Sequence, residues 1–166
     1  MDGGDLSFDS KVFRQALGQF ATGVAVMTTR DDQGRGIGVT VNSFTSVSLD
    51  PPLVSFCLDR EALSFASFTG AETFAVNILS SDQQDVSQSF ARSIGEDKFA
   101  GVVCEVDDHG APLIKGCLAW LSCKRHTMVE AGDHVIILGE VYHLSLGHPG
   151  APLLYFRGKY AKIHDV

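Results

Sequence analysis

The chain lacks the features that mark several large classes of protein. Its 166 residues carry 13 Lys and Arg against 20 Asp and Glu, a net charge of −7, so it has no basic excess for binding nucleic acid. No apolar run approaches the length that crosses a bilayer, and the N-terminal Met1-Asp2-Gly3-Gly4-Asp5 is not a basic signal start. We therefore expect a soluble, cytoplasmic protein without nucleic-acid or membrane partners.

Cysteine and histidine are too sparse or too irregularly spaced for a disulfide framework or a metal site. The four cysteines form no C-x-x-C pair and lie in apolar runs, which favours buried free thiols. The histidines show no H-x-x-x-H spacing, so we expect no metal. With 45% hydrophobic and 20% charged residues, the composition is that of one globular domain over residues 1–166, in which we expect 1–9 to be flexible.

Hydrophobic patterns and turn signals predict a mainly β protein with short helices. One helix is expected between Ser10, its N-cap, and Gly23, with Val12, Phe13, Ala16, Leu17 and Phe20 on one apolar face. Two more are expected at Glu61–Thr69 and after the capping box Ser81-Asp82-Gln83-Gln84. Strands are expected at Val24–Thr29, Ile37–Ser43, Leu53–Leu58, Phe74–Leu79, Val102–Val106, Leu113–Thr127 and His134–Leu146. This order favours a closed or partly closed antiparallel barrel.

The most informative segment is Gly38–Leu53, a β-branched strand with a polar end that stops at Asp50-Pro51-Pro52. Its uncharged donors and acceptors, in apolar surroundings, are Thr40, Asn42, Ser43, Thr45 and Ser46. Such a set suits a planar, hydrogen-bonding heterocycle better than a metal or a carboxylate. From the residues alone, an edge strand whose hydroxyls face water is the commoner explanation. The preceding Gly34–Val39 lacks the third glycine of G-x-G-x-x-G and no helix follows it, so we interpret it as a hairpin.

This segment closely resembles the flavin-binding stretch of the flavin reductase-like family, the small reductases of two-component flavin monooxygenases. Further segments match the family in the same order: Phe56-Cys57-Leu58, Phe74–Leu79, Asp97-Lys98-Phe99, Gly132-Asp133-His134 and Pro152–Tyr160. Each match is weak alone, but together they extend the resemblance from about Phe13 to Tyr160. The resemblance implies an FMN-binding split β-barrel, Greek-key-like, with peripheral helices. It also implies a homodimer with the flavin near the subunit interface.

The resemblance further implies which residues bind the flavin. It places Cys57 under the ring as a pocket wall, and Arg60 and Ser64 at the flavin phosphate, beside the N–H groups of a helix starting near Glu61. Lys98 would reach the phosphate or the ribityl chain. The implied set is Thr40, Val41, Asn42, Ser43, Ser46, Cys57, Leu58, Asp59, Arg60, Ser64, Phe90, Lys98 and Phe99.

Gly132-Asp133-His134 is a tight turn that opens a strand, and by resemblance it is the signature that binds the nicotinamide dinucleotide. His134 would hydrogen-bond the dinucleotide or face its pyrophosphate. Tyr160 is grouped with this turn, although a core aromatic explains it equally well. We expect no catalytic side chain, because hydride transfer depends on stacking the nicotinamide over the flavin.

The function implied is that of an NAD(P)H-dependent flavin reductase that passes reduced FMN or FAD to a partner monooxygenase. Two alternatives share the barrel. One is a flavin-binding or electron-transfer protein without enzymatic activity. The other is an FMN oxidase similar to pyridoxamine-phosphate oxidase, whose second phosphate needs a basic cluster, and no dense Arg/Lys group lies beside Thr40–Ser46 in the sequence. The choices between FMN and FAD, and between NADH and NADPH, stay open.

Overall fold

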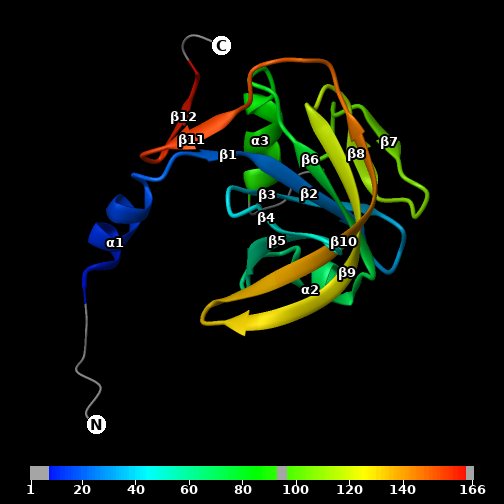
Figure 1. The fold of residues 1–166 in the computed structure, drawn as a ribbon, viewed down its shortest axis with the longest axis horizontal. Coiled ribbons are helices and arrows are strands. Elements are labelled where there is room, and N and C mark those ends of the chain that lie inside the picture. Colours follow the sequence, from blue (N-terminus) through cyan, green and yellow to red (C-terminus); the bar gives the residue numbers. More distant parts are fainter. Residues whose placement is uncertain (1–7, 93–96, 164–166) are drawn as a thin grey trace.

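The body of the protein is one antiparallel sheet of seven strands that curls on itself (Figure 1). The computed structural model describes residues 8–92 and 97–163. In sheet order the strands are β3 (Gly36–Val41), β2 (Ala25–Arg30), β6 (Thr73–Ile78), β9 (Ala119–Ala131), β10 (His134–Leu146), β5 (Pro52–Asp59) and β4 (Thr45–Leu49). The expected mainly β, antiparallel fold is confirmed.

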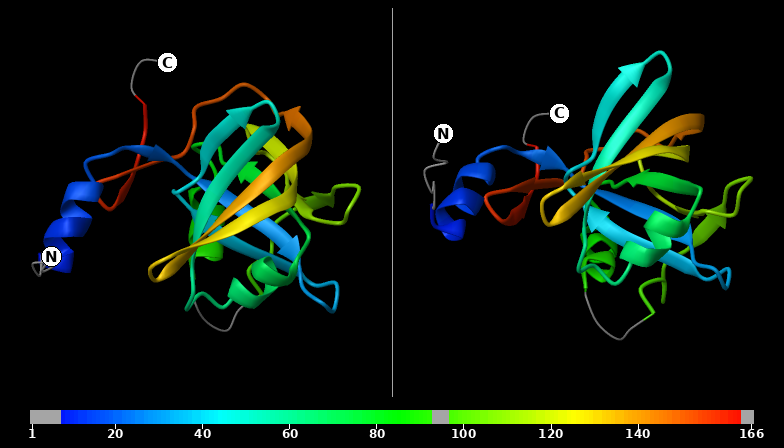
Figure 2. Two further views of the ribbon diagram at one scale, coloured as in Figure 1. Left: turned by 60° about the horizontal axis from the view of Figure 1, so that its bottom comes forward. Right: turned by 90° about the horizontal axis from the view of Figure 1, so that it is seen from below.

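The barrel is open between β3 and β4, which are the two edge strands of the sheet. These strands are consecutive in the chain, and Asn42–Phe44 connects them across the opening. β4 and β5 form a hairpin that projects from the barrel (Figure 2), and Asp50-Pro51-Pro52 makes its turn as expected. The polar segment of the sequence therefore lies where the barrel is split.

Smaller elements surround this sheet. β1 (Thr22–Gly23), β11 (Leu154–Phe156) and β12 (Lys159–Ala161) form a second sheet, and β7 (Cys104–Val106) pairs with β8 (Pro112–Ile114). The helices are α1 (Ser10–Leu17), α2 (Phe65–Gly70) and α3 (Gln84–Ala91). α3 packs against β3, whereas α1 lies outside the barrel beside β11 and β12 (Figures 1 and 2). None of the described helices is long and apolar enough to span a membrane.

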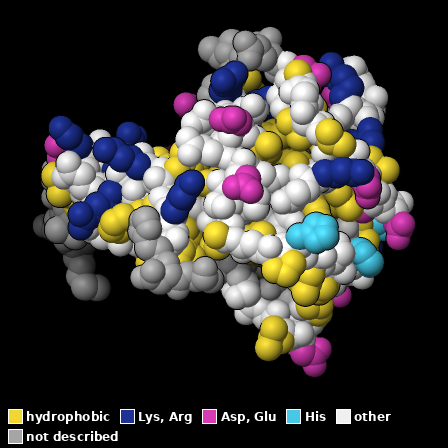
Figure 3. Space-filling view, turned by 90° about the horizontal axis from the view of Figure 1, so that it is seen from above, with side chains coloured by type: hydrophobic (Ala, Val, Ile, Leu, Met, Phe, Trp, Pro, Cys, Tyr) yellow, Lys and Arg dark blue, Asp and Glu magenta, His cyan; other side chains and the backbone are white. Residues whose placement is uncertain are grey.

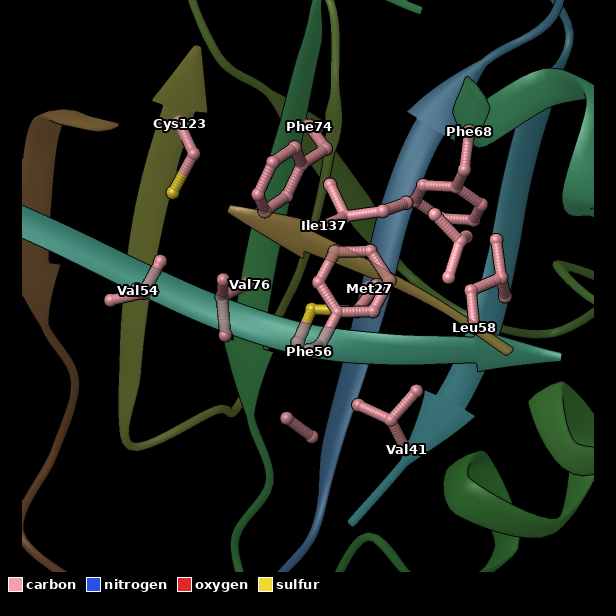
Figure 4. Packing of buried hydrophobic residues seen from close by; sticks show 12 residues of the cluster. Met27, Val41, Val54, Phe56, Leu58, Phe68, Phe74, Val76, Cys123 and Ile137 are labelled. Carbon is pink, nitrogen blue, oxygen red and sulfur yellow. The ribbon is translucent and has the colours of Figure 1, made fainter. Parts of the chain in front are cut away.

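The barrel interior is filled by one hydrophobic cluster, shown in Figure 4. Phe56 lies at its centre, with its ring edge-on to Phe68 at 5.7 Å and to Phe74 at 5.3 Å between centroids. Burying a side chain of this size stabilises the fold by roughly 1.5–3 kcal/mol. A second cluster lies outside the barrel wall and includes Phe90 of α3 and Leu153.

A buried amide joins the small hairpin β7–β8 to the barrel. Asn77, on β6, donates from Nδ2 to the carbonyl of Val26 and to Oγ1 of Thr28, both at 3.0 Å. Its Oδ1 accepts from the backbone N–H of Ile114 at 2.7 Å. Thr28 in turn donates to the carbonyl of Pro112 at 2.5 Å. Because an unpaired buried amide is costly, these bonds fix β8 on the barrel.

The first helix differs from the prediction at both ends. Asp9, not Ser10, is the N-cap, since its Oδ1 accepts from the N–H of Lys11 at 2.8 Å. The helix ends at Leu17, with Gly18 rather than Gly23 after it. No residue of the helix is buried, and of its apolar face Phe13 meets the ring of Phe8, with centroids 5.1 Å apart. The flexibility expected for 1–9 falls mostly outside the described residues.

The predicted capping box is also wrong. α3 begins at Gln84, and Gln83 uses its side chain in the preceding loop, where Oε1 accepts from the N–H of Ser80 at 3.0 Å. Its Nε2 donates to the carbonyl of Lys115 at 2.8 Å. Gln83 therefore binds this loop to the segment after β8 instead of capping the helix.

One predicted strand is divided and another is shorter than expected. The stretch expected at Leu113–Thr127 is β8 and β9, separated by a turn at Gly116, whose φ of 84° favours glycine. The stretch expected at Ile37–Ser43 ends at Val41, and β4 follows. β4 was missed because four of its five residues are exposed, so it lacks the apolar alternation of a half-buried strand.

Gly139 tests the packing of the barrel wall. A methyl group at this position would overlap the ring of Phe74 and lie 2.9 Å from Cβ of Cys123. We expect Gly139→Ala to lower the free energy of unfolding by about 1–3 kcal/mol through overpacking, measured by urea denaturation. Gly70→Ala is the matched control, because nothing lies within 4 Å of its added Cβ, and it should leave stability unchanged or slightly raised. Equal effects of the two substitutions would contradict this packing.

Candidate functional site

The loop across the barrel opening is held by a hydroxyl. Ser43 Oγ accepts from the N–H of Cys57 at 3.0 Å and lies 3.3 Å from the Cys57 carbonyl, to which it donates. The loop is thereby tied to β5, and Cys57 lies directly beside it. Asn42 is exposed at the opening, as is Ser46 on β4. These residues are accessible to a molecule that lies against the opening.

Thr40 belongs to a separate polar group beneath α3. Its Oγ1 donates to the carbonyl of Ser87 at 2.7 Å, and Ser87 Oγ lies 2.8 Å from the hydroxyl of Tyr160. Sequence reasoning missed Ser87, although it lies three residues before Phe90 and therefore on the same buried face of α3. Tyr160 is consequently beside Thr40 and not beside Gly132, and Figure 1 shows β12 far from the β9–β10 hairpin.

The turn Gly132-Asp133 joins β9 to β10, as predicted, with Gly132 at a φ of 64°. The N–H of Arg60 donates to the Asp133 carbonyl at 3.1 Å, and Arg60 Nε donates to the Gly132 carbonyl at 3.3 Å. His134 Nδ1 lies 2.8 Å from Asp133 Oδ1, and this hydrogen bond and the imidazole charge hold the pKa of Asp133 below its usual range. Asp59 faces His134 across the ladder. Asp59 and Arg60, predicted to bind flavin, therefore lie next to Gly132–His134, predicted to bind nicotinamide, at this end of β5 and β10.

The phosphate contacts expected around Arg60 differ from the prediction. No helix begins near Glu61: its N–H donates to Asp59 Oδ1 at 2.8 Å, and α2 starts only at Phe65. The Arg60 guanidinium forms an ion pair with Glu130. A phosphate at Arg60 would therefore compete with a carboxylate that is already bound.

A pocket of about 710 Å³ lies beside the open edge strand β3. It contains three of the predicted flavin-binding residues, Ser64, Lys98 and Phe99, which come from distant parts of the sequence. Its other lining residues are Arg30, Arg35, Gly36, Ile37, Gly38, Leu63, Asp97, Cys104, Glu105, Val106 and Pro112. The fold thus gathers a hydroxyl, an ammonium and an aromatic ring around one hollow.

Three cations, Arg30, Arg35 and Lys98, and two carboxylates, Asp97 and Glu105, line the pocket, which we call the cationic pocket because the cations outnumber the carboxylates. It lies beside Gly36–Gly38 and includes none of Thr40–Ser46, so the expected absence of a dense basic group beside that segment stays a prediction. Arg35 is paired with Asp31 at 2.7 Å, and Arg30 donates to two backbone carbonyls. Among the described residues Lys98 Nζ donates to the carbonyl of Phe90, at 3.3 Å, and burial lowers the pKa of Lys98. Within the described chain Lys98 is therefore the lining cation best placed to receive an anion.

Three of the implied flavin-binding residues lie in the hydrophobic cores. Val41 and Leu58 belong to the barrel interior, and Phe90 is fully buried in the second cluster, edge-on to Phe99 at 4.8 Å. Their side chains are occupied by packing, so only their backbone groups are available to a ligand. Phe99, which is half-buried and lines the pocket, is the accessible member of the aromatic pair.

The described residues contain no group of three or more His, Cys, Asp or Glu placed to hold a metal ion. The cysteines are free, and burial raises the pKa of both Cys117 and Cys123 to about 12, so these thiols are protonated and unreactive. What the described site offers is hydrogen bonding, positive charge and stacking surface.

A split antiparallel barrel with a polar loop at its opening and a cationic pocket beside it offers surfaces that suit a planar, phosphorylated organic molecule. Residues 17–164 match the flavin reductase like domain. The chain belongs to this family.

The relatives span both short and long proteins. A flavin reductase of Pseudomonas putida is 45% identical over 154 residues, covering 93% of this chain and 90% of that protein. The reductase component of the flavin-dependent trigonelline monooxygenase of Acinetobacter baylyi is 44% identical, and this chain spans 89% of its own length but only 47% of that protein. The structure of the Streptomyces globisporus NADH:FAD oxidoreductase SgcE6, in complex with NAD and FAD fragments, superposes with a TM-score of 0.88 at 37% identity, covering 94% of each chain.

Proposed function

We propose that this protein is an NAD(P)H-dependent flavin reductase, which transfers hydride from a nicotinamide to FMN or FAD and supplies the reduced flavin to a separate monooxygenase. The observation that carries the proposal is the cationic pocket beside the polar opening of a flavin reductase-like barrel. The similarity to a flavin reductase, a monooxygenase reductase component and an NADH:FAD oxidoreductase supports each part of it.

The residues of the opening fit the ring of a flavin. Asn42 and Ser46 are exposed there. The hydroxyl of Ser43 fixes the loop to the backbone of Cys57 through two hydrogen bonds. Neutral donors and acceptors on a fixed backbone match the carbonyls and N–H of the ring edge. Cys57 would form part of the wall beneath the ring.

The pocket fits the phosphate end. Lys98 supplies a charged donor, Ser64 a buried hydroxyl and Phe99 an apolar surface for the ribityl chain or the ring. Charge-assisted hydrogen bonds of this kind are about twice as strong as neutral ones. We therefore place the flavin phosphate near Lys98, with the ring directed toward the opening.

The Gly132–His134 turn would receive the nicotinamide dinucleotide. His134 is held by Asp133, which orients its imidazole, and both lie at the end of β5 that carries Cys57 and Asp59. A flavin bound at the opening would supply N5 as the hydride acceptor. The protein contributes position: it holds the flavin against β5 and leaves one face free for the nicotinamide, and it needs no acid or base.

Activity is tested directly by mixing the purified protein with NADH or NADPH and free FMN, FAD or riboflavin. The expected result is flavin-dependent loss of the nicotinamide absorbance. A protein that copurifies with yellow FMN yet oxidises neither nicotinamide would instead be a flavin-binding or electron-transfer protein. Oxidation of an aminated, phosphorylated pyridine would support the oxidase alternative.

Lys98→Met tests the phosphate site. Losing the ammonium should raise the KM for FMN by about 10- to 100-fold while changing the KM for riboflavin little, because riboflavin has no phosphate. In the parent protein kcat/KM for FMN should also fall as pH rises through the lowered pKa of Lys98, since the charged form is lost there. The variant should lose this pH dependence. Lys124→Met, an exposed lysine on β9, is the control, and an equal KM increase for both flavins would contradict the assignment.

We also propose that two copies associate through the arm formed by α1, β11 and β12. This arm is held together by Arg157, whose N–H donates to the Gly18 carbonyl and whose Nε donates to Gln19 Oε1, both at 2.9 Å. In α1, about half or more of the accessible surface of Val12, Phe13 and Leu17 is exposed to solvent. An apolar face of this kind is normally covered by a partner.

The charge distribution supports a second copy of this chain as the partner. The arm (residues 8–20 and 154–163) has five Lys and Arg and one Asp, whereas residues 21–92 and 97–153 have eight against fifteen acidic residues. Figure 3 shows several of the Lys and Arg side chains on the arm, at the left of the view. A basic, partly apolar arm is complementary to the acidic body of another molecule.

We expect a dimer in light scattering coupled to size exclusion, and Leu17→Glu should raise the dissociation constant by at least about tenfold, because a charge would be buried in the contact. Gln15→Glu makes a similar charge change on a polar residue of the same helix and should leave the dimer intact. A parent protein that is monomeric at micromolar concentration would exclude this assembly.

A further inference from the structure

The outer wall of the cationic pocket is the β7–β8 hairpin. β7 contributes Cys104, Glu105 and Val106 to the lining, and β8 contributes Pro112. β8 is fixed to the barrel by Asn77 and Thr28. Among the described strands β7 pairs with β8 alone, and it is also held by packing of Cys104 on the second cluster and by the Glu105–Lys115 ion pair. At its other end, the position of β7 depends on how the loop between the two strands is held.

One carboxylate both closes this loop and anchors it. Asp107 Oδ1 accepts from the N–H of His109 at 3.0 Å and of Ala111 at 2.9 Å. Its Oδ2 accepts from the hydroxyl of Tyr142, on β10, at 2.9 Å. The ring of Tyr142 also meets the His109 ring edge-on, with centroids 5.0 Å apart. The loop is thus attached to the main sheet by a side chain that lies outside the pocket.

A second attachment comes from the opposite direction. Arg30, on β2, donates from Nε to the carbonyl of Gly110 and from Nη1 to the carbonyl of Gly34, and its side chain lines the pocket. Gly110 has a φ of 84°, which a residue with a side chain adopts at a cost. The loop is consequently held by Tyr142 and Ser122 on one side and by Arg30 on the other.

The electrostatics keep the Tyr142 contact formed over a wide pH range. Burial raises the pKa of Asp107, but hydrogen bonds from Ser122, Tyr142 and two backbone amides outweigh it, and the net pKa lies below the usual range. Burial and the Asp107 carboxylate raise the pKa of Tyr142 to about 12. The hydroxyl therefore remains a donor, and the contact weakens only as pH falls through the lowered pKa of Asp107.

We propose that Tyr142 is a positioning residue for flavin binding: by holding the Asp107–Ala111 loop, it sets β7 as the wall of the pocket without touching the flavin. This inference rests on the proposed function, since it takes the pocket to hold the phosphate end of the flavin. Loss of the contact loosens one wall, so it weakens flavin binding and leaves hydride transfer in the saturated enzyme intact.

Tyr142→Phe removes the hydroxyl and keeps the ring against His109. We expect the dissociation constant for FMN, measured by quenching of flavin fluorescence, to rise about 3- to 10-fold, which corresponds to one hydrogen bond. At saturating FMN, kcat should stay within about twofold of the parent. Without FMN, amide hydrogen exchange over Cys104–Val106 should be faster in Tyr142→Phe than in the parent protein. The control is Tyr155→Phe, because its ring packs on Tyr160 and its hydroxyl has no hydrogen-bond partner among the described residues.

Asp107 variants separate anchoring from general destabilisation. Asp107→Asn keeps an oxygen for the loop amides and an amide group facing Tyr142, so it should bind FMN almost as tightly as the parent. Asp107→Ala should weaken FMN binding at least as much as Tyr142→Phe does, and the two changes combined should be less than additive.

The outcomes distinguish this inference from the proposed function. Faster exchange in β7 with unchanged FMN affinity would overturn the positioning role, and unchanged exchange together with unchanged affinity would overturn the anchor itself. A parent protein that binds neither FMN nor FAD in any assay would refute the proposed function and, with it, the role of Tyr142. An equal loss of affinity in Tyr155→Phe would mean that the effect is not specific to the loop, which also overturns the proposal.

Discussion

The arrangement of this site depends on one constraint: the seven-stranded sheet curls into a barrel but does not pair its two edge strands. Hydrogen bonds between β3 and β4 would close the wall and bury the polar residues between them. Because those strands stay apart, the connecting loop carries Asn42 at an accessible opening, and Ser43 fixes that loop to Cys57. The Phe56-centred core keeps the wall rigid on the inner side, so the opening can be permanent and not a fluctuation.

The second requirement is a cationic hollow in an acidic protein. Arg30, Lys98 and Ser64 are separated by more than thirty residues along the chain in each case, and only the packing of β2, α2 and the segment before β7 brings them together. Of the three lining cations, Arg35 is paired with Asp31, whereas Arg30 donates to the backbone carbonyls of Gly110 and Gly34. Among the described residues, Lys98 is hydrogen-bonded to one backbone carbonyl, and this is the cation to which we assign the phosphate in the proposed function. β7 forms the outer wall of this pocket. Its position depends in part on the Asp107–Ala111 loop, which Tyr142 of β10 holds through Asp107.

Sequence reasoning succeeded where a local pattern has one physical solution. The run His134–Leu146 is a strand with the bounds expected, and Gly132-Asp133 is the turn before it, because a long β-branched segment after a glycine turn has no competing structure. It failed where a side chain is taken by a distant partner. Gln83 donates to the Lys115 carbonyl instead of capping the helix, and Tyr160, grouped by resemblance with the Gly132 turn, has its hydroxyl beside Ser87 on α3 while its nicotinamide role stays a prediction. The partners in these two bonds are 32 and 73 residues apart in the sequence, so no local pattern predicts them.

The amino-acid sequence by itself determined the family, the mainly β antiparallel barrel, the polar segment at Thr40–Ser46 and the acidic charge. Strand propensity, turn residues and ordered motifs are local properties, so they can be recognised in the sequence alone. The tertiary structure alone decided that Thr40 faces α3, that Val41, Leu58 and Phe90 are core residues, and that Lys98 shares a pocket with two arginines. Each of these depends on which face of an element is buried and on what another element places there, and that is fixed only when the whole chain packs.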